Sequence, residues 1–345
     1  MAMRGVMLLA FQVLLLCFLA QAWNTERGSF ELESQRESLK NVHLVTDCMH
    51  VTSEEGEYSF VKLPPTRTTS KQPWLNSLES LPLPNGAPDV ATESPAAPTT
   101  VCGIYFVADP DQVIEVTMRQ MNVECATGGL MAFVDGWELN GQYFPGEWEH
   151  EKRLDLRVQE FCVEPGAEPW PGKSSSNAWV FRSSQNAALI QYRVPVRGSF
   201  VLSARFLHNA RPCNIMAEGL APYYMLRNYG QRRNCTLTAL FPAVVSVVAL
   251  ETGPIDGIVR YCDRVPRPTD KLEIGGSAGL DPHNMLKATT LCGHSGGRMD
   301  LEQSILCGTT SVRLVSSGHY NNQAMVTMRL AEDADLRLTT IMCEM

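Results

Sequence analysis

After its first 22 residues, the 345-residue sequence has no apolar run long enough to cross a membrane. A membrane-spanning helix needs about 20 predominantly apolar residues. The longest later run, residues 240–250, is shorter and contains Pro242 and Ser246. The final residues, I-M-C-E-M, do not form a lipid-anchor signal. We therefore expect no membrane anchor.

The sequence also lacks the usual patterns of metal and catalytic sites. After residue 22, no two cysteines lie closer than 15 residues, whereas zinc sites typically use closely spaced pairs. The seven histidines are scattered, and none forms an H-E-x-x-H motif. Residues 293–297, G-H-S-G-G, fit the G-x-S-x-G hydrolase elbow, but that elbow needs a parallel strand before it and a helix after it. We expect no enzyme, no cofactor and no metal site.

Basic residues do not gather into a patch, which argues against nucleic acid as a partner. The first feature that the sequence does contain is a predicted signal peptide at residues 1–22. Arg4 precedes an apolar stretch over 6–20, and Ala20-Gln21-Ala22 offers a cleavage site. Its removal leaves 28 basic and 37 acidic residues, a net charge of −9. We expect a secreted, extracellular protein.

Ten of the 11 cysteines remain after this cleavage, because Cys17 lies in the predicted signal peptide. An even set in a secreted chain predicts five disulfides. Asn234-Cys235-Thr236 is an N-glycosylation acceptor, so Asn234 is expected to be glycosylated and to lie at the surface.

Short segments of alternating apolar residues dominate the chain and predict a β-sandwich architecture. Six segments read as strands: residues 113–118, 130–134, 187–194, 199–206, 312–315 and 323–330. We predict an N-terminal domain over 23–206 and a C-terminal domain over 207–345. The stretch 62–100 is rich in Pro, Ser and Thr and is expected to be a disordered insertion in the first domain.

A weak internal repeat favours two domains of one type. The string V-F-R-S-S at 180–184 is echoed by V-R-L-V-S-S at 312–317. The first half resembles a CUB domain through Cys125, the F-V-D-G string at 133–136, Cys162 and the S-S-Q-N turn at 183–186.

A closer resemblance covers residues 48–343. The strings V-D-G-W-E-L-N-G-Q-Y-F-P, G-S-A-G-L-D-P and V-R-L-V-S-S-G, the ten cysteines and the glycosylation acceptor are similar to the corticotropin-releasing-factor-binding protein family. This resemblance implies an all-β protein of two tandem CUB-like, jelly-roll β-sandwiches stapled by disulfides, here an invertebrate-type member. It also implies sequential pairing of the cysteines: Cys48 with Cys102, Cys125 with Cys162, Cys213 with Cys235, Cys262 with Cys292, and Cys307 with Cys343.

Many CUB domains hold calcium through a Glu and two Asp residues. At the corresponding Asp positions this chain has Gly129 and Gln185, so Asp135 alone is left and no calcium site is expected there. The residues at 149–151, E-H-E, read as a solvated loop.

The resemblance implies a secreted binding protein that sequesters corticotropin-releasing-factor-like peptide hormones, such as diuretic-hormone-like peptides, and limits their receptor signalling. The family's basic and acidic residues around the first cysteine correspond to Leu44 and His50 here, so that pair is not carried over. The apolar segment 39–51 is expected to bind an amphipathic helix, with Leu44, Asp47 and His50 as candidate contacts. The alternative is a CUB-type adhesion or matrix protein, which a flat polar surface would favour. We expect a monomer.

Overall fold

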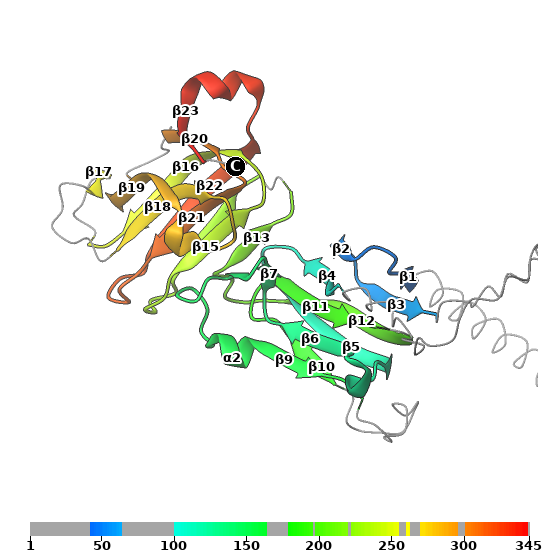
Figure 1. Cartoon of the computed structure of the whole chain (residues 1–345). Helices are drawn as coiled ribbons and strands as arrows, with labels where there is room; N and C mark the ends of the chain where they lie inside the picture. Colours follow the sequence, from blue (N-terminus) through cyan, green and yellow to red (C-terminus); the bar gives the residue numbers. More distant parts are fainter. Residues whose placement is uncertain are drawn as a thin grey trace, which may run out of the picture.

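Two β-sandwiches lie next to each other, the N-terminal one carrying the blue to green strands and the C-terminal one the yellow-green to red strands (Figure 1). This computed structural model describes residues 42–63, 100–163, 179–195, 197–219, 222–254, 260–262, 270–295 and 301–343. The predicted signal peptide, residues 39–41 of the apolar segment and residues 64–99 of the predicted insertion lie outside this range.

The N-terminal sandwich consists of two five-stranded sheets. The first sheet has the order β1 (Val42–Leu44), β3 (Gly56–Lys62), β12 (Gly198–His208), β5 (Gln112–Asn122) and β10 (Val180–Arg182). The second has the order β2 (Met49–Thr52), β4 (Cys102–Val107), β11 (Ala187–Arg193), β6 (Leu130–Val134) and β9 (Val158–Phe161). A hairpin of β7 (Trp137–Leu139) and β8 (Gln142–Phe144) and the short helices η1 (Cys125–Thr127) and α2 (Leu154–Arg157) complete it.

Alternating side chains from both sheets meet in the core between them. Phe106, Phe133, Ile190 and Phe200 are fully buried there. The strand β12 pairs with β5 as far as His208, two residues beyond the predicted domain boundary at 206. The chain therefore leaves the first sandwich only after His208.

The eleven strands described in the C-terminal sandwich belong to one hydrogen-bonded sheet, and the two halves of this sheet form the two layers of the sandwich. One half has the order β13 (Ile215–Ala217), β15 (Cys235–Ala239), β21 (Thr309–Val315), β18 (Lys271–Ser277) and β19 (Leu286–His294), with β17 (Arg260–Tyr261) also on β19. The other has the order β14 (Tyr224–Arg227), β22 (Gln323–Leu330), β16 (Ala243–Thr252), β20 (Leu301–Leu306) and β23 (Thr339–Met342). The helices η3 (Pro282–Asn284) and η4 (Asp333–Leu338) lie outside the sheets.

The two sandwiches repeat one strand order. In order across the sheet, β2-β4-β11-β6-β9 corresponds to β13-β15-β21-β18-β19, and in both sets the first pair is parallel. The serine-rich echo between 180–184 and 312–317 does not follow this correspondence, because Ser184 precedes β11 whereas Ser317 follows β21. The two strings therefore do not mark equivalent strands of the two sandwiches.

A third apolar cluster joins the sandwiches. Trp137 and Phe144 of the β7–β8 hairpin pack on the outer face of the second N-terminal sheet, together with Met216 and Leu280 from the C-terminal sandwich. Asn186 donates to the Met216 carbonyl and accepts from the Met216 amide, each at 2.8 Å. The two sandwiches therefore share buried apolar and polar contacts.

The described residues form five disulfides, and each joins cysteines of the same sandwich. They pair Cys48 with Cys102, Cys125 with Cys162, Cys213 with Cys235, Cys262 with Cys292, and Cys307 with Cys343. These are the pairs that the family resemblance implies. The all-β, disulfide-stapled two-sandwich class predicted from sequence is confirmed, and within the described ranges no helix has the length and apolarity to cross a membrane.

Candidate functional site

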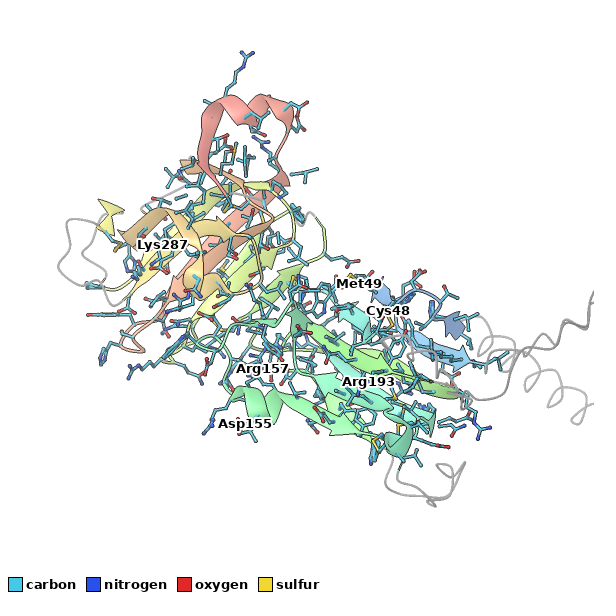
Figure 2. All side chains as sticks on the ribbon, in the orientation of Figure 1. Cys48, Met49, Asp155, Arg157, Arg193 and Lys287 are labelled. Carbon is cyan, nitrogen blue, oxygen red and sulfur yellow. A yellow bond between two sulfur atoms is a disulfide. The ribbon has the colours of Figure 1, made fainter. Side chains whose placement is uncertain are left out.

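Both sheets of the N-terminal sandwich begin at the same edge of the molecule. The strand β1 is the outermost strand of the first sheet, and β2 is the outermost strand of the second. Within the ranges that the structure describes, each pairs with a strand on one side alone, which leaves backbone groups along its other side. In Figure 1 these strands are the blue elements, and Figure 2 shows Cys48 and Met49 at this edge.

Seven exposed apolar side chains cover this edge, and we refer to them as the apolar edge. They are Val42, Leu44, Met49, Val51, Val61, Leu63 and Val101. Their exposed fractions range from 44% for Val42 to 77% for Leu63. Isolated exposed apolar residues are common, but seven of them on or next to the strands β1, β2, β3 and β4 are typical of a binding surface.

Strand periodicity explains which side chains reach this surface. Along β1, Val42 and Leu44 point outward while His43 points inward and stacks on Tyr58 at 4.7 Å between ring centroids. Along β2, Met49 and Val51 point outward while His50 points inward. Alternate residues of a strand point to opposite faces, so a single strand presents every second side chain.

The predicted contact residues therefore occupy different environments. Leu44 is 62% exposed, and Asp47 is exposed in the turn between β1 and β2. His50 is half-buried, with its ring 6.0 Å from that of Tyr58. Val45, which belongs to the apolar segment 39–51 that was expected to bind the ligand, is only 3% exposed and packs in the core instead. Sequence reasoning missed Met49, whose outward position follows from the alternation of β2.

A rigid support lies under the apolar edge. Tyr58 is fully buried, its hydroxyl donates to the Glu54 carbonyl at 2.6 Å, and its ring meets that of Phe106 at 5.1 Å. The Gly103 amide donates to the Cys48 carbonyl at 2.8 Å, beside the disulfide between Cys48 and Cys102. The edge strands are thus anchored to the sandwich from below.

A second group of polar residues lies near the joint between the sandwiches, around Asp135. Its carboxylate accepts from the amide and hydroxyl of Ser184, each at 2.6 Å, and from Gln185 Nε2 at 3.0 Å. Lys152 Nζ lies 2.9 Å and His150 Nε2 3.4 Å from the same carboxylate. Burial alone would raise the pKa of Asp135, but the bonds from His150, Ser184 and Lys152 hold it well below its usual range.

The loop at 149–151 was predicted to be solvated, and this was wrong for two of its three residues. Glu149 is 3% and His150 8% exposed. The Glu149 carboxylate accepts from Arg313 Nε at 2.7 Å, and Arg313 Nη1 reaches Glu273 Oε2 at 3.3 Å. The charges of Glu149 and Arg313 are buried because each has the other as its partner across the joint, which a single sequence does not reveal.

The hydrolase-like string at 293–297 has a structural role at its described residues. The Ser295 hydroxyl accepts from the Leu250 amide at 2.9 Å and donates to the Leu250 carbonyl at 3.2 Å. His294 Nε2 lies 3.1 Å from the Gly253 carbonyl. Ser295 follows the antiparallel strand β19, not the parallel strand that a nucleophile elbow requires. Among the residues placed by the structure, no group of three or more His, Cys, Asp or Glu side chains could hold a metal ion.

Two family models match the chain, one for each sandwich. The model described as the corticotropin-releasing factor binding protein N-terminal domain matches residues 88–207, and that for the C-terminal domain matches residues 216–337. Together they cover well over half of the sequence. The chain belongs to the corticotropin-releasing factor-binding protein family.

Curated relatives agree with this family. The chain is 29% identical over 245 residues to the human corticotropin-releasing factor-binding protein, covering 69% of this chain and 71% of that protein. It is 29% identical to the Xenopus laevis protein of the same name, covering 66% of this chain and 68% of that protein. The mouse protein is 26% identical over 278 residues, which is 78% of this chain and 81% of that protein.

Solved structures similar to the chain include CUB modules. The CUB1-EGF-CUB2 domain of human MASP-1/3 aligns at 10% identity over 67% of this chain and 94% of that one, with a TM-score of 0.21. The corresponding rat MASP-1 domains align at 10% identity over 83% and 100%, with a TM-score of 0.23. These scores are too low to carry an argument, so the fold assignment rests on the strand order and the family.

The Asp135 cluster leads to a prediction about acid stability. Asp135→Asn is expected to lower the free energy of unfolding at neutral pH by about 2–3 kcal/mol, because it removes a charged acceptor of several hydrogen bonds. A folded-state pKa below the unfolded value gives stability that is present above about pH 4 and is lost as the pH falls further. The difference between wild type and variant should therefore shrink below pH 4, as measured by urea unfolding.

Asp155→Asn provides the control for this experiment, because its side chain is 64% exposed and pairs only loosely with Arg153 at 3.4 Å. It should leave the unfolding midpoint almost unchanged. A difference between Asp135→Asn and wild type that stays constant from pH 7 to pH 3 would contradict the role assigned to the Asp135 carboxylate.

Proposed function

We propose that this protein binds a corticotropin-releasing-factor-like peptide hormone outside the cell and lowers its free concentration near the receptor. Three observations support the proposal: the family, the relatives named for binding corticotropin-releasing factor, and the apolar edge. A diuretic-hormone-like peptide is the ligand we would test first. Sequestration of this kind needs binding alone and no chemical step.

The apolar edge is the single observation that supports peptide binding most directly. Leu44 and Met49 are 62% and 59% exposed on the edge strands β1 and β2, so each could bury an apolar side chain of a bound peptide. Burial of one such side chain is worth about 1.5–3 kcal/mol. A few anchors of this size are enough for specific binding, since hot-spot residues supply most of the energy of an interface.

Charge near the apolar edge favours a peptide with basic residues. Asp47 is exposed in the turn between β1 and β2, and Glu54 is exposed just beyond β2. The whole chain has 37 acidic and 29 basic residues, which gives the protein a net charge of −8. Complementary charge speeds association and selects the partner more than it adds affinity.

Leu44→Asp tests this surface. The variant should weaken binding of a synthetic diuretic-hormone-like peptide about 30-fold, or about 2 kcal/mol, because it places an unpaired charge in an apolar contact. Isothermal titration calorimetry on secreted protein would measure the dissociation constant. Leu336→Asp is the matched control, because Leu336 is 54% exposed on η4, far along the chain from the apolar edge.

The outcomes of these binding measurements distinguish peptide binding at the apolar edge from binding elsewhere and from the adhesion or matrix alternative. If Leu44→Asp is secreted normally and binds the peptide as wild type does, the binding surface lies elsewhere. If the unmodified protein binds none of a panel of such peptides, the adhesion or matrix alternative is favoured. Sequestration itself is tested by adding the protein to cells that carry the peptide's receptor, where it should shift the peptide dose–response curve to higher concentrations.

A further inference from the structure

A hollow of about 520 Å³ lies where the two sandwiches meet. One wall is Trp148, from the loop between β8 and α2 of the N-terminal sandwich. The facing wall belongs to the C-terminal sandwich and includes Arg232, Asn234, Val315 and His319. The volume falls within the roughly 300–1,000 Å³ of sites that bind small ligands.

Trp148 offers an exposed aromatic platform, a flat ring on which a ligand can pack. Its side chain is among the most exposed large apolar groups of the described residues, at 67%, although it lies at the joint. Its ring meets that of His283 at 5.7 Å, so the indole is held in place while much of its surface remains open. Flat aromatic faces carry partial negative charge and attract the C–H face of a sugar ring.

Asn234 points toward this platform. Its Nδ2 atom lies 3.5 Å from the Trp148 carbonyl oxygen and is the donor of that contact. Asn234 is also the acceptor residue of the sequence Asn234-Cys235-Thr236. A sugar attached to Nδ2 would therefore start inside the hollow, next to the indole.

We propose that the first N-acetylglucosamine of a glycan on Asn234 fills this hollow, packs on Trp148 and links the two sandwiches. The amide keeps one hydrogen on Nδ2 after attachment and still donates to the Trp148 carbonyl. Arg232 and His319 supply charged and polar donors to the sugar's hydroxyl and acetamide oxygens. The covalent tether keeps the sugar at high local concentration, so a weak contact is occupied most of the time.

Attachment must precede folding of β15. Cys235 and Thr236 are fully buried, and Cys235 forms the disulfide with Cys213. The transfer forms a bond between Nδ2 and the anomeric carbon of a lipid-pyrophosphate-linked oligosaccharide. It breaks the bond from that carbon to the pyrophosphate oxygen, Nδ2 loses one proton, and the lipid pyrophosphate leaves. The enzyme that performs this transfer needs the Thr236 hydroxyl to be accessible, as it is only in the unfolded chain.

The test is the rate at which peptide-N-glycosidase releases the glycan from native secreted protein. Trp148→Ala should speed release about tenfold, because the sugar loses its aromatic contact and its shelter. Trp148→Phe keeps a flat ring and should remain close to wild type. Tyr223→Ala is the matched control, since Tyr223 is 58% exposed and does not line the hollow.

Thermal unfolding gives a second, independent readout. Asn234→Gln should lower the melting temperature in the wild-type background and have little further effect in the Trp148→Ala background, because the two residues act through one contact. Equal release rates for wild type and Trp148→Ala would overturn the proposal. So would additive melting shifts, or mass spectrometry that finds Asn234 unmodified in the secreted protein.

Discussion

Arg313→Ala is expected to lower the free energy of unfolding by about 3–5 kcal/mol, the usual cost of breaking a buried ion pair. Arg313 Nε donates to Glu149 at 2.7 Å, and the Glu149 side chain is fully buried. The Glu149 residue comes from the N-terminal sandwich and Arg313 from β21 of the C-terminal one. Loss of the guanidinium leaves a buried carboxylate without its cation at the joint.

Both pH and a second substitution test this explanation. Burial raises the pKa of Glu149, and the Arg313 charge opposes the increase, so the pKa should rise further in Arg313→Ala. An acid with a raised folded-state pKa is stabilised when it is protonated, so lowering the pH should narrow the difference between variant and wild type. Adding Glu149→Gln to Arg313→Ala should recover part of the lost stability.

Arg329→Ala is the control for Arg313→Ala. Arg329 forms two hydrogen bonds of 2.7 Å with Asp335, but its side chain is 47% exposed. Solvent screens such a pair, so its removal should change the urea midpoint little. Similar losses for Arg313→Ala and Arg329→Ala would show that burial of the Glu149–Arg313 pair is not what stabilises the joint.

Opening the Cys48–Cys102 disulfide is the second large effect that we expect. The bond closes a loop with a sequence separation of 54, and its removal by Cys48→Ala with Cys102→Ala should cost about 4 kcal/mol in the chain-entropy model. Cys48 lies directly before β2, so the apolar edge should also become more mobile. Peptide binding should then weaken about tenfold, because ordering this segment would cost conformational entropy.

The Cys213–Cys235 disulfide gives the comparison. Its sequence separation is 22, and its removal should cost about 3 kcal/mol by the same model. It lies in the C-terminal sandwich, so thermal unfolding should change almost as much while calorimetry shows the peptide affinity of wild type. An equal loss of peptide affinity in both double variants would mean that the effect reflects global stability and not the apolar edge.

The strands were predictable because local alternation determines them. Residues 130–134 and 323–330 alternate or run apolar between turn residues, and they form β6 and β22 with those bounds. The same rule predicts that Leu44 points outward. It also points Val45 inward, and Val45 is buried in the core, where its amide donates to the Ser59 carbonyl at 2.9 Å, so its assignment to the ligand-binding apolar segment was wrong.

Features that depend on distant partners could not be predicted in this way. Glu149 looks like a surface residue in the sequence, and only the contact with Arg313, 164 residues later, explains its burial. The glycosylation acceptor at Asn234 was visible in the sequence, but its proximity to Trp148, 86 residues earlier, was not. The proposed ligand class rests on the family resemblance, because no spacing or periodicity in this chain encodes it.

The apolar cluster shared by Trp137, Phe144, Met216 and Leu280 has a consequence for how this protein is processed. None of the five disulfides connects the two sandwiches. A protease that cuts the connecting segment between His208 and Cys213 would therefore separate the chain covalently, yet the fragments would stay together through this cluster and the Glu149–Arg313 pair. Such a nicked protein would behave as a non-covalent heterodimer. Gel electrophoresis would show the two fragments as separate bands only under denaturing conditions.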